Sequence, residues 1–310
     1  MPPRSPLPQR HGLGAAWLRT PDRGKPRPDP WPTMGTWLRH RLPERVDVAQ
    51  MLADERFVYD TGTAVGDDHP YTPHTFVWFH RDLVDEVAVP GEIHVVHQDD
   101  RIVVVDKPAF LSSIPRGGHV RQSVVVRLRA ELGLPELSAL HRLDRITSGL
   151  LMLGTERRWR GAYQSMFQNG TVRKTYRAVA PWRADLELPV TVRNHLGKER
   201  GRWQAAVVPG APVNAETLVE LESRDGDRAV YRLTPRTGRT HQLRVHLQGL
   251  GIPIVDDPLY PEVLDVPVDD FSRPLQLLAS ELAFTDPVDG SEQRFESVRQ
   301  LPLHPHPRWG

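Results

Sequence analysis

The stretch His141–Gly154, HRLDRITSGLLMLG, is the part of the sequence around which the rest is organised. Its first half is polar and contains Arg142 and Asp144, whereas Leu150–Leu153 is a short apolar run that predicts a buried strand. Asp144 is therefore expected on a loop beside the core, where Arg142, Arg145 and nearby hydroxyl groups favour its ionised form. An ionised carboxylate in such a place can act as a nucleophile, although a salt-bridged turn would have the same local sequence.

Length and composition limit the class of protein. The chain has 310 residues, enough for a full catalytic core and a second small domain. No stretch approaches the roughly 20 apolar residues of a membrane span, and the N-terminus has no apolar signal core. The sequence contains no cysteine, which excludes disulfides and thiolate metal sites. We therefore expect a cytoplasmic protein that does not associate with membranes.

Charge is unevenly distributed along the chain, although the formal net charge is only +1. Residues 141–183 contain nine Lys or Arg and two acids, and residues 232–246 contain four Arg and no acid. Residues 254–270 contain six acids and no base. A phosphate backbone would be attracted to the first two segments and repelled by the third.

Residues 91–310 carry the patterns of the main domain, in which short strands and amphipathic helices are mixed. The expected helices are 123–132 and 156–168, and the expected strands are 93–96, 102–105, 172–180, 228–234, 275–284 and 294–297. The second helix has an apolar and aromatic stripe that is more typical of a core face than of a ligand site. Residues 91–310 are thus expected to fold as an α+β domain.

Two stretches after the opening one carry further candidate residues. In the strand 172–180, the alternation of side chains places Lys174 and Tyr176 on one face. In PRTGRTHQLRVHLQGLG, residues 235–251, Thr240 can cap a helix that fixes Arg244 on one of its faces.

The same helix contains His241 and His246, which raise the question of a metal site. They are five residues apart, and no cysteine or H-E-x-x-H pattern accompanies them, so capping or packing is the better interpretation. We expect no metal.

Three of these stretches resemble the motifs of one known family. HRLDRITSGLL at 141–151 is similar to the H-R-L-D-x-x-T-S-G-L-L signature of the RluA family of pseudouridine synthases. KTYRA at 174–178 resembles the second motif of that family, and RTGRTHQLRVHL at 236–247 resembles the third. The first motif is highly specific, and the resemblance covers roughly residues 91–302.

The resemblance implies both a fold and a reaction. The fold is an α+β domain with a mixed, largely antiparallel sheet and a central cleft. The reaction is the isomerisation of specific uridines to pseudouridine in structured RNA, either ribosomal or transfer RNA. It needs no cofactor and no metal, and we expect the enzyme to act as a monomer.

The resemblance also implies a role for each matching residue. Asp144 is the catalytic residue, and Arg244 pairs with it as a bidentate fork. Arg142 helps to turn the target nucleotide out of the RNA stack and fills the vacated space, and Tyr176 stacks on the flipped uracil. The Tyr176 hydroxyl is also suited to relay a proton, which makes Tyr176 a catalytic residue together with Asp144 and Arg244. Further RNA contacts are expected from Arg145, Lys174 and Arg239.

The sequence before the main domain is expected to form two parts. Residues 1–35 are rich in proline and arginine without an apolar period, and we expect a disordered basic arm. Residues 36–90 show two short helical patterns and two strands, 57–59 and 76–79, which predict a small α/β module. RNA binding and simple packing are both open as roles for this module.

The chain departs from the family pattern at three positions near the site. Phe110, Asp256 and Pro261 stand where the family commonly has Gly, so the loop after Phe110 and the turn at 256–261 are expected to differ, whereas Asp257 matches the family's Asp. Asp256 and Asp257 are adjacent and should point apart, which argues against a pair of carboxylates acting together.

Two other classes of function compete with the isomerase. A catalytically silent RNA-binding protein would keep the basic segments but could lose Asp144 or Arg244, and both are present. A glycoside hydrolase needs two carboxylates that flank the scissile bond, and only Asp144 lies in a motif with catalytic surroundings.

Overall fold

The structure is a computed structural model that describes residues 3–22, 31–83 and 85–301. The chain divides into two compact units, Met1–Asp85 and Glu86–Gly310. This division falls close to the boundary expected between residues 90 and 91. None of the helices within the described ranges is long and apolar enough to cross a membrane.

The first unit is a three-stranded antiparallel sheet that packs against two short helices. Its elements are β1 (Ala16–Arg19), α1 (Met34–Arg41), α2 (Val48–Ala53), β2 (Val58–Tyr59) and β3 (Phe76–Phe79). The strand order is β1-β3-β2. Helix α1 begins after Thr33, whose hydroxyl accepts the backbone N–H of Thr36, and Trp37 and Leu38 of this helix join the core of the unit.

The expectation that residues 1–35 form a disordered arm is wrong for residues 3–22 and 31–35, and the start of α1 lies in the second of these segments. Strand β1 lies in the first segment and pairs antiparallel with β3. Only Ala16 and Leu18 among its four residues pack against the core, so the strand is too short to produce a recognisable apolar period. The remainder of the predicted arm before residue 31 lies outside the described residues.

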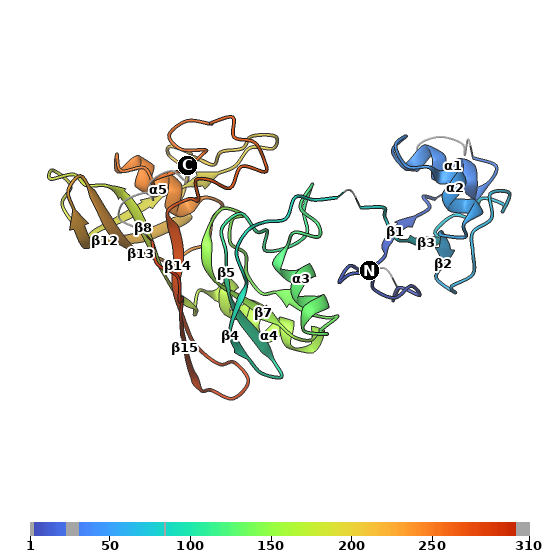
Figure 1. The fold of residues 1–310 in the computed structure, drawn as a ribbon, viewed down its shortest axis with the longest axis horizontal. Helices are drawn as coiled ribbons and strands as arrows, with labels where there is room; N and C mark the ends of the chain where they lie inside the picture. Colours follow the sequence, from blue (N-terminus) through green and yellow to red (C-terminus); the bar gives the residue numbers. More distant parts are fainter. Residues whose placement is uncertain (1–2, 23–30, 84, 302–310) are drawn as a thin grey trace. The chain divides into compact units, whose positions relative to one another are not determined.

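The second unit is built on a ten-stranded sheet, shown in Figure 1. Its strands are β4 (His94–Gln98), β5 (Ile102–Lys107), β6 (Ser138–Ala139), β7 (Ser148–Gly154), β8 (Arg173–Pro181), β9 (Val190–Asn194), β12 (Ala215–Asp225), β13 (Arg228–Pro235), β14 (Leu277–Thr285) and β15 (Glu292–Glu296). Its helices are α3 (Val124–Glu131), α4 (Arg157–Asn169) and α5 (Gln242–Gly249), and a separate hairpin consists of β10 (Leu196–Gly197) and β11 (Ala206–Val207).

The strand order confirms the predicted α+β fold with a mixed, largely antiparallel sheet. Eight strands follow the order β4-β5-β7-β14-β8-β13-β12-β9, while β6 pairs with β7 and β15 with β14. Strands β7 and β14 are parallel, and the other described strand pairs are antiparallel. Every helix and strand expected after residue 91 is present, with ends shifted by no more than two residues.

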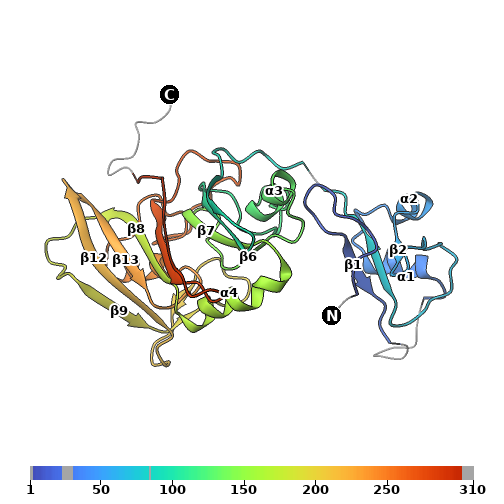
Figure 2. The same cartoon turned by 90° about the horizontal axis from the view of Figure 1, so that it is seen from below.

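Strands β5 and β7 are buried on both faces, so alternate residues pack against different helices. Val103 and Val105 of β5 belong to the apolar cluster that includes α3. Ile102 and Val104 belong to the cluster that includes α4. Figure 2 shows α3 and α4 on opposite sides of β7. Strand β7 is therefore packed on both of its faces, and this packing fixes the position of the loop that precedes it.

Gly149 allows β7 to approach β14 at the point where the opening motif enters the sheet. Its φ is +107°, and a Cβ atom there would lie 2.3 Å from the carbonyl oxygen of Ala279. Any other residue would force the parallel pair apart. The glycine of the motif is therefore a requirement of backbone packing.

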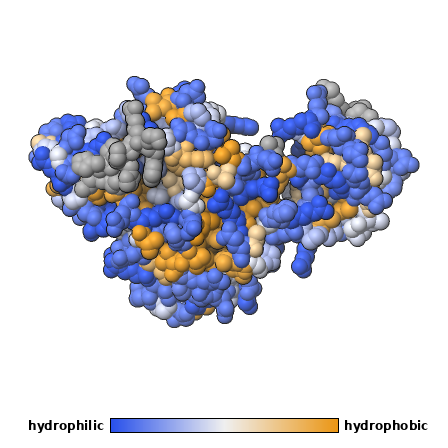
Figure 3. Space-filling model, viewed as in Figure 1, coloured by the Kyte–Doolittle hydropathy of each residue, from blue (hydrophilic) through white to orange (hydrophobic). Residues whose placement is uncertain are grey.

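Hydrophilic side chains cover most of the face seen in Figure 3. In the second unit, hydrophobic side chains gather around β4 and β5 on this face, and Val95 of β4 is 45% exposed. The remaining apolar clusters lie between the sheet and its helices, where they hold the site in place.

Candidate active site

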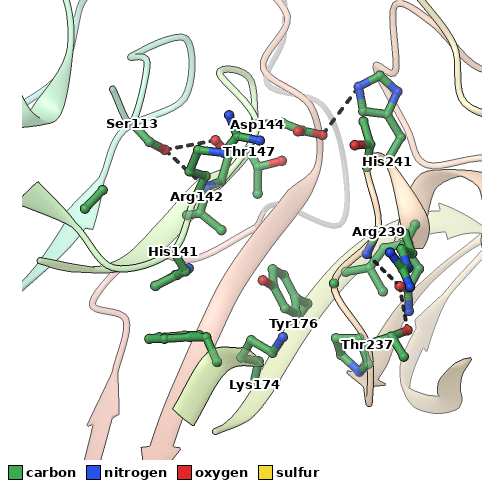
Figure 4. Close-up of a pocket in the computed structure, with 18 of the residues that line it drawn as sticks. Ser113, His141, Arg142, Asp144, Thr147, Lys174, Tyr176, Thr237, Arg239 and His241 are labelled. Atoms are coloured by element: carbon green, nitrogen blue, oxygen red, sulfur yellow. Dashed lines mark hydrogen bonds and ion pairs between the residues drawn. The ribbon is translucent and has the colours of Figure 1, made fainter. Parts of the chain in front are cut away.

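Asp144 lies on the loop between β6 and β7, beside a cavity of about 1100 Å³. The loop turns tightly, because the backbone N–H of Thr147 donates to the carbonyl oxygen of Asp144 over 3.1 Å. The Asp144 side chain is 35% exposed. Figure 4 shows Asp144, Arg142 and Thr147 on one side of the cavity, with His241 facing the carboxylate. The sequence had placed Asp144 on such a loop beside the core.

Lys107, at the end of β5, supports this loop from inside the core. Its side chain is fully buried, and Nζ donates to the carbonyl oxygens of Pro108, Leu111 and Arg145 at 2.9, 2.8 and 3.1 Å. Burial lowers the pKa of Lys107 to about 7, although the charge of Asp144 opposes this shift. The hydrogen bond to Arg145 holds the backbone immediately after Asp144, and the other two hold the segment that follows β5.

Arg244, on α5, is the cation that faces Asp144. Its Nη1 donates to Oδ2 of Asp144 over 3.3 Å, while Nε and Nη2 donate to the two carboxylate oxygens of Asp257 at 2.8 and 2.5 Å. The guanidinium carbon lies 5.1 Å from the centre of the Tyr260 ring. Burial alone would lower the pKa of Arg244, but the hydrogen bonds and charge of Asp257 and the charge of Asp144 raise it.

The expected bidentate pairing of Arg244 with Asp144 is wrong, because the fork holds Asp257. The Asp257 side chain is 0% exposed, whereas the 35% exposed Asp144 is partly hydrated and makes a single contact. Two backbone N–H groups also donate to Asp257, at 2.8 and 3.2 Å. Asp256 turns away to Arg273, as expected for adjacent acids. A family motif marked Asp257, but its contact with Arg244, which lies 13 residues earlier without a shared period, was not indicated.

Two of the three departures from the family pattern keep a backbone conformation that glycine favours. Phe110 has a φ of +67° and Asp256 a φ of +60°. These two residues therefore adopt a conformation that glycine would adopt without strain. The centre of the Phe110 ring lies 5.3 Å from that of the Phe271 ring and 5.7 Å from the guanidinium carbon of Arg145. These contacts compensate for the strained conformation.

His241, and not Thr240, is the N-cap residue of α5. It adopts a left-handed conformation with a φ of +56°, and its side chain makes no capping hydrogen bond. Instead, Nε2 lies 3.9 Å from Oδ2 of Asp144, and Nδ1 lies 3.0 Å from the hydroxyl of Tyr260. The predicted cap at Thr240 is wrong because the helix starts at Gln242, one residue later than that cap requires, and His241 lines the cavity.

The His241 ring is neutral over the physiological pH range. Burial lowers its pKa to about 4. The charges of Arg244 and Lys198 act in the same direction, while those of Asp144 and Asp257 oppose them. A neutral imidazole therefore stands beside Asp144.

His246 has the packing role that the sequence indicated. It is fully buried, with Nδ1 2.9 Å from the Thr217 hydroxyl and Nε2 3.1 Å from the Asn194 side chain. Within residues 3–22, 31–83 and 85–301, no group of three or more His, Asp or Glu residues could hold a metal ion.

Tyr176 and Lys174 project from β8 into the cavity, as Figure 4 shows. Tyr176 is partly buried and packs against two apolar clusters of the second unit. Burial, and secondly the charge of Asp144, raise the pKa of its phenol. Burial lowers the pKa of Lys174. The face shared by these two residues, expected from strand alternation, is confirmed.

Three arginines expected to bind RNA also line the cavity. Arg142 is exposed, and no hydrogen bond or ion pair holds its guanidinium within the described part of the chain. Nη1 of Arg145 donates to the carbonyl oxygens of Phe110 and Val268 at 3.4 and 3.5 Å. Nε of Arg239 donates to a backbone carbonyl at 3.1 Å.

Comparison with known proteins identifies the family. A family model described as RNA pseudouridylate synthase matches residues 101–249. The chain is 37% identical over 212 residues to the dual-specificity RNA pseudouridine synthase RluA of Vibrio parahaemolyticus, covering 62% of this chain and 78% of that protein. The chain belongs to the RluA family of RNA pseudouridine synthases.

A second relative in sequence and a solved structure of the same fold are also pseudouridine synthases by name. The ribosomal large subunit pseudouridine synthase D of Neisseria meningitidis is 30% identical over 223 residues, covering 68% of this chain and 59% of that protein. The solved structure of human RNA pseudouridylate synthase domain containing 1 has the same fold, with a TM-score of 0.53 and 23% identity. It covers 69% of this chain and 93% of the solved one. As an RluA-family enzyme, the chain is an isomerase that converts uridine in RNA to pseudouridine.

Proposed function

We propose that Asp144 is the nucleophile of this RluA-family enzyme and that Arg244 holds it in place. Among the described residues that line the cavity, Asp144 is the one carboxylate, and eight are Lys or Arg. This ratio carries the proposal. A single anion among many cations suits a phosphate-bearing substrate that is attacked at one point.

The same lining argues against the two competing functions. A glycoside hydrolase needs a second carboxylate across the scissile bond, and the described lining offers none. A silent RNA-binding protein has no need for a carboxylate 3.3 Å from a 2% exposed arginine. The charge of Asp144 repels the phosphates of RNA, so a carboxylate at this place weakens binding and is explained by a catalytic role.

The reaction begins with extrusion of the target nucleotide, because its glycosidic bond is not accessible inside a stack. We assign Arg142 to the space that the base leaves, since its guanidinium is exposed at the rim of the cavity. Tyr176 then stacks on the uracil, a contact worth roughly 1–3 kcal/mol. Asp144 attacks the sugar or the base. Arg145, Lys174 and Arg239 contact the RNA as cavity-lining cations.

We propose ribosomal or transfer RNA as the substrate, in the cytoplasm, with the enzyme acting as a monomer. A relative named for the large ribosomal subunit supports the first part. Pseudouridine mapping of total RNA from a deletion strain and its parent tests it. Loss of one uridine modification in the deletion strain is expected, and an unchanged map would contradict the proposal.

The two units have different parts in this proposal. Residues 86–310 catalyse, and the first unit assists RNA binding. On the first unit, Trp17 is 45% exposed and its ring lies 5.5 Å from that of Phe76, over which Arg19 places its guanidinium carbon at 5.7 Å. An aromatic ring beside a guanidinium is a surface on which an unpaired base can stack.

Tyr176→Phe keeps the stacking surface and tests the hydroxyl, which we propose as a proton relay, so turnover should fall while RNA affinity is retained. Tyr176→Ala should weaken RNA affinity about 5- to 150-fold, the equivalent of one lost stack. Tritium release from RNA labelled at uracil C5, measured with RNA titration, separates the two effects. A Phe variant with wild-type turnover would restrict Tyr176 to a stacking role.

Arg142→Ala should reduce kcat/KM about 10- to 100-fold on a structured RNA loop, because extrusion of a stacked base costs a few kcal/mol. The loss should be much smaller on a short single-stranded RNA with the same target. Arg294→Ala, which removes an exposed arginine that is paired with Glu281 and Glu296, is the matched control. Equal losses on both RNAs would limit Arg142 to a phosphate contact.

A further inference from the structure

The basic loop, residues 198–203, lies between β10 and β11 and is exposed along its whole length. It contains three cations and one acid. The backbone N–H of Arg202 donates to the carbonyl oxygen of Glu199 over 3.3 Å, which closes a tight turn. Gly201, with a φ of +88°, supplies the conformation that the third position of this turn requires. The turn thus defines where the chain presents the next residue, Trp203.

Trp203 is the most exposed large hydrophobic residue within the described ranges, at 74%. The other tryptophans of those ranges are either buried or in contact with another ring or a guanidinium. Trp182, for example, lies under Arg224, whose guanidinium carbon is 3.2 Å from the ring centre. Neither an aromatic ring nor a guanidinium of the described residues lies over Trp203. The indole therefore offers a free flat surface to a planar group.

The backbone that follows Trp203 is anchored beside the active site. The backbone N–H of Ala205 donates to the Tyr260 hydroxyl over 2.7 Å, and this hydroxyl donates to the Ala205 carbonyl oxygen over 3.0 Å. The Tyr260 ring lies against the guanidinium of Arg244, which contacts Asp144. Two residues of extended chain span about 7 Å, so Trp203 is held close to this anchor.

The charges around Trp203 suit an anionic strand. Glu199 is occupied by Arg202, with 2.7 Å between its Oε2 and the arginine Nε. Arg200 is exposed and has no ion pair or hydrogen bond to a described residue, and Lys198 lines the cavity. An uncovered aromatic ring among cations is the arrangement that binds single-stranded nucleic acid, because the ring stacks on a base while the cations contact phosphates.

We propose that Trp203 stacks on an unpaired base of the target RNA loop, outside the cavity, an inference that rests on the proposed reaction site at Asp144. Extrusion of the uridine breaks the stack of the loop, and Arg142 fills only the space of the uridine itself. The indole gives a second base of the same loop a new stacking partner. A purine has the larger planar face, so Trp203 favours loops with an unpaired purine at this position.

Binding of two short RNAs to the full chain tests the stacking contact. The first is a single strand of about 12 nucleotides with one uridine between adenines. The second has the same phosphates but lacks the adenine bases. Trp203→Ala should weaken binding of the first RNA about 5- to 150-fold and leave that of the second unchanged, and Trp203→Phe, which keeps a flat ring, should lose less. Unchanged affinity for the first RNA, or equal losses for both, would overturn the proposal.

Turnover separates RNA binding from support of the active site. Trp203→Ala should raise KM for RNA labelled at uracil C5 and leave kcat unchanged, because the indole does not touch the reacting uridine. A fall in kcat at unchanged KM would mean that Trp203 maintains the structure of the site, and the proposal would fail. Val207→Ala shortens a 44% exposed side chain of β11 and is the matched control, with binding and turnover expected as in the wild type.

Two further variants separate this contact from phosphate binding and from the role of Asp144. Arg200→Ala removes a charge and no ring, so it should weaken both RNAs alike. Activity in Asp144→Asn would refute the nucleophile, but a loss confined to the base-bearing RNA in Trp203→Ala would still stand. Normal RNA binding by Trp203→Ala beside an inactive Asp144→Asn overturns only the present inference.

Discussion

Replacing Asp144 by asparagine should lower kcat by about 10⁴-fold or more while RNA binding is retained. The amide has nearly the same shape as the carboxylate but lacks its nucleophilic charge. The cavity-lining cations that attract the RNA are unchanged, and Arg244 remains fixed by Asp257. Tritium release from RNA labelled at uracil C5, together with an RNA-binding titration, measures both quantities.

Asp256→Asn provides the matched control for this experiment. Asp256 pairs with the exposed Arg273 at 2.6 Å and does not line the cavity. Both variants remove one negative charge, so a general electrostatic effect on RNA would appear in both. Turnover close to wild type in Asp144→Asn, or equal losses in the two variants, would remove Asp144 from its proposed role.

The sequence was sufficient to predict elements whose apolar pattern is long and regular. Leu150–Leu153 forms the buried strand that it predicted, and the stripe of α4 places Tyr163 and Met166 in the core. The motifs also predicted correctly that Asp144 and Arg244 are in contact. Each residue lies in or next to an element with a regular apolar pattern. Periodicity and a specific motif are local signals, and the sheet then fixes their relative positions.

What could not be predicted depends on contacts between segments without a shared pattern. Asp257, which lies in an irregular segment, accepts two hydrogen bonds from the Arg244 guanidinium, and the spacing of the two residues does not indicate this contact. His241 looked like a capping or packing residue, since the sequence does not show that its backbone turns left-handed. Strand β1 was missed because four residues are too few to show a period.

Replacing Arg244 by alanine should lower both stability and turnover. Asp257 would remain 0% exposed with its charge uncompensated, which costs about 3–5 kcal/mol of the free energy of unfolding. Asp144 would lose its charged partner, and kcat should fall about 10²- to 10³-fold. Urea unfolding measures the first effect, and single-turnover tritium release at saturating RNA measures the second.

A double variant separates the structural role of Arg244 from its role in the reaction. Arg244→Met with Asp257→Asn removes both buried charges, and asparagine keeps the oxygen that accepts two backbone N–H groups. Because well-packed neutral groups replace a buried ion pair at little cost, most of the stability should return. Turnover should stay low, since Asp144 still lacks the guanidinium that holds it at 3.3 Å. If turnover returned with stability, Arg244 would serve the fold and not the nucleophile.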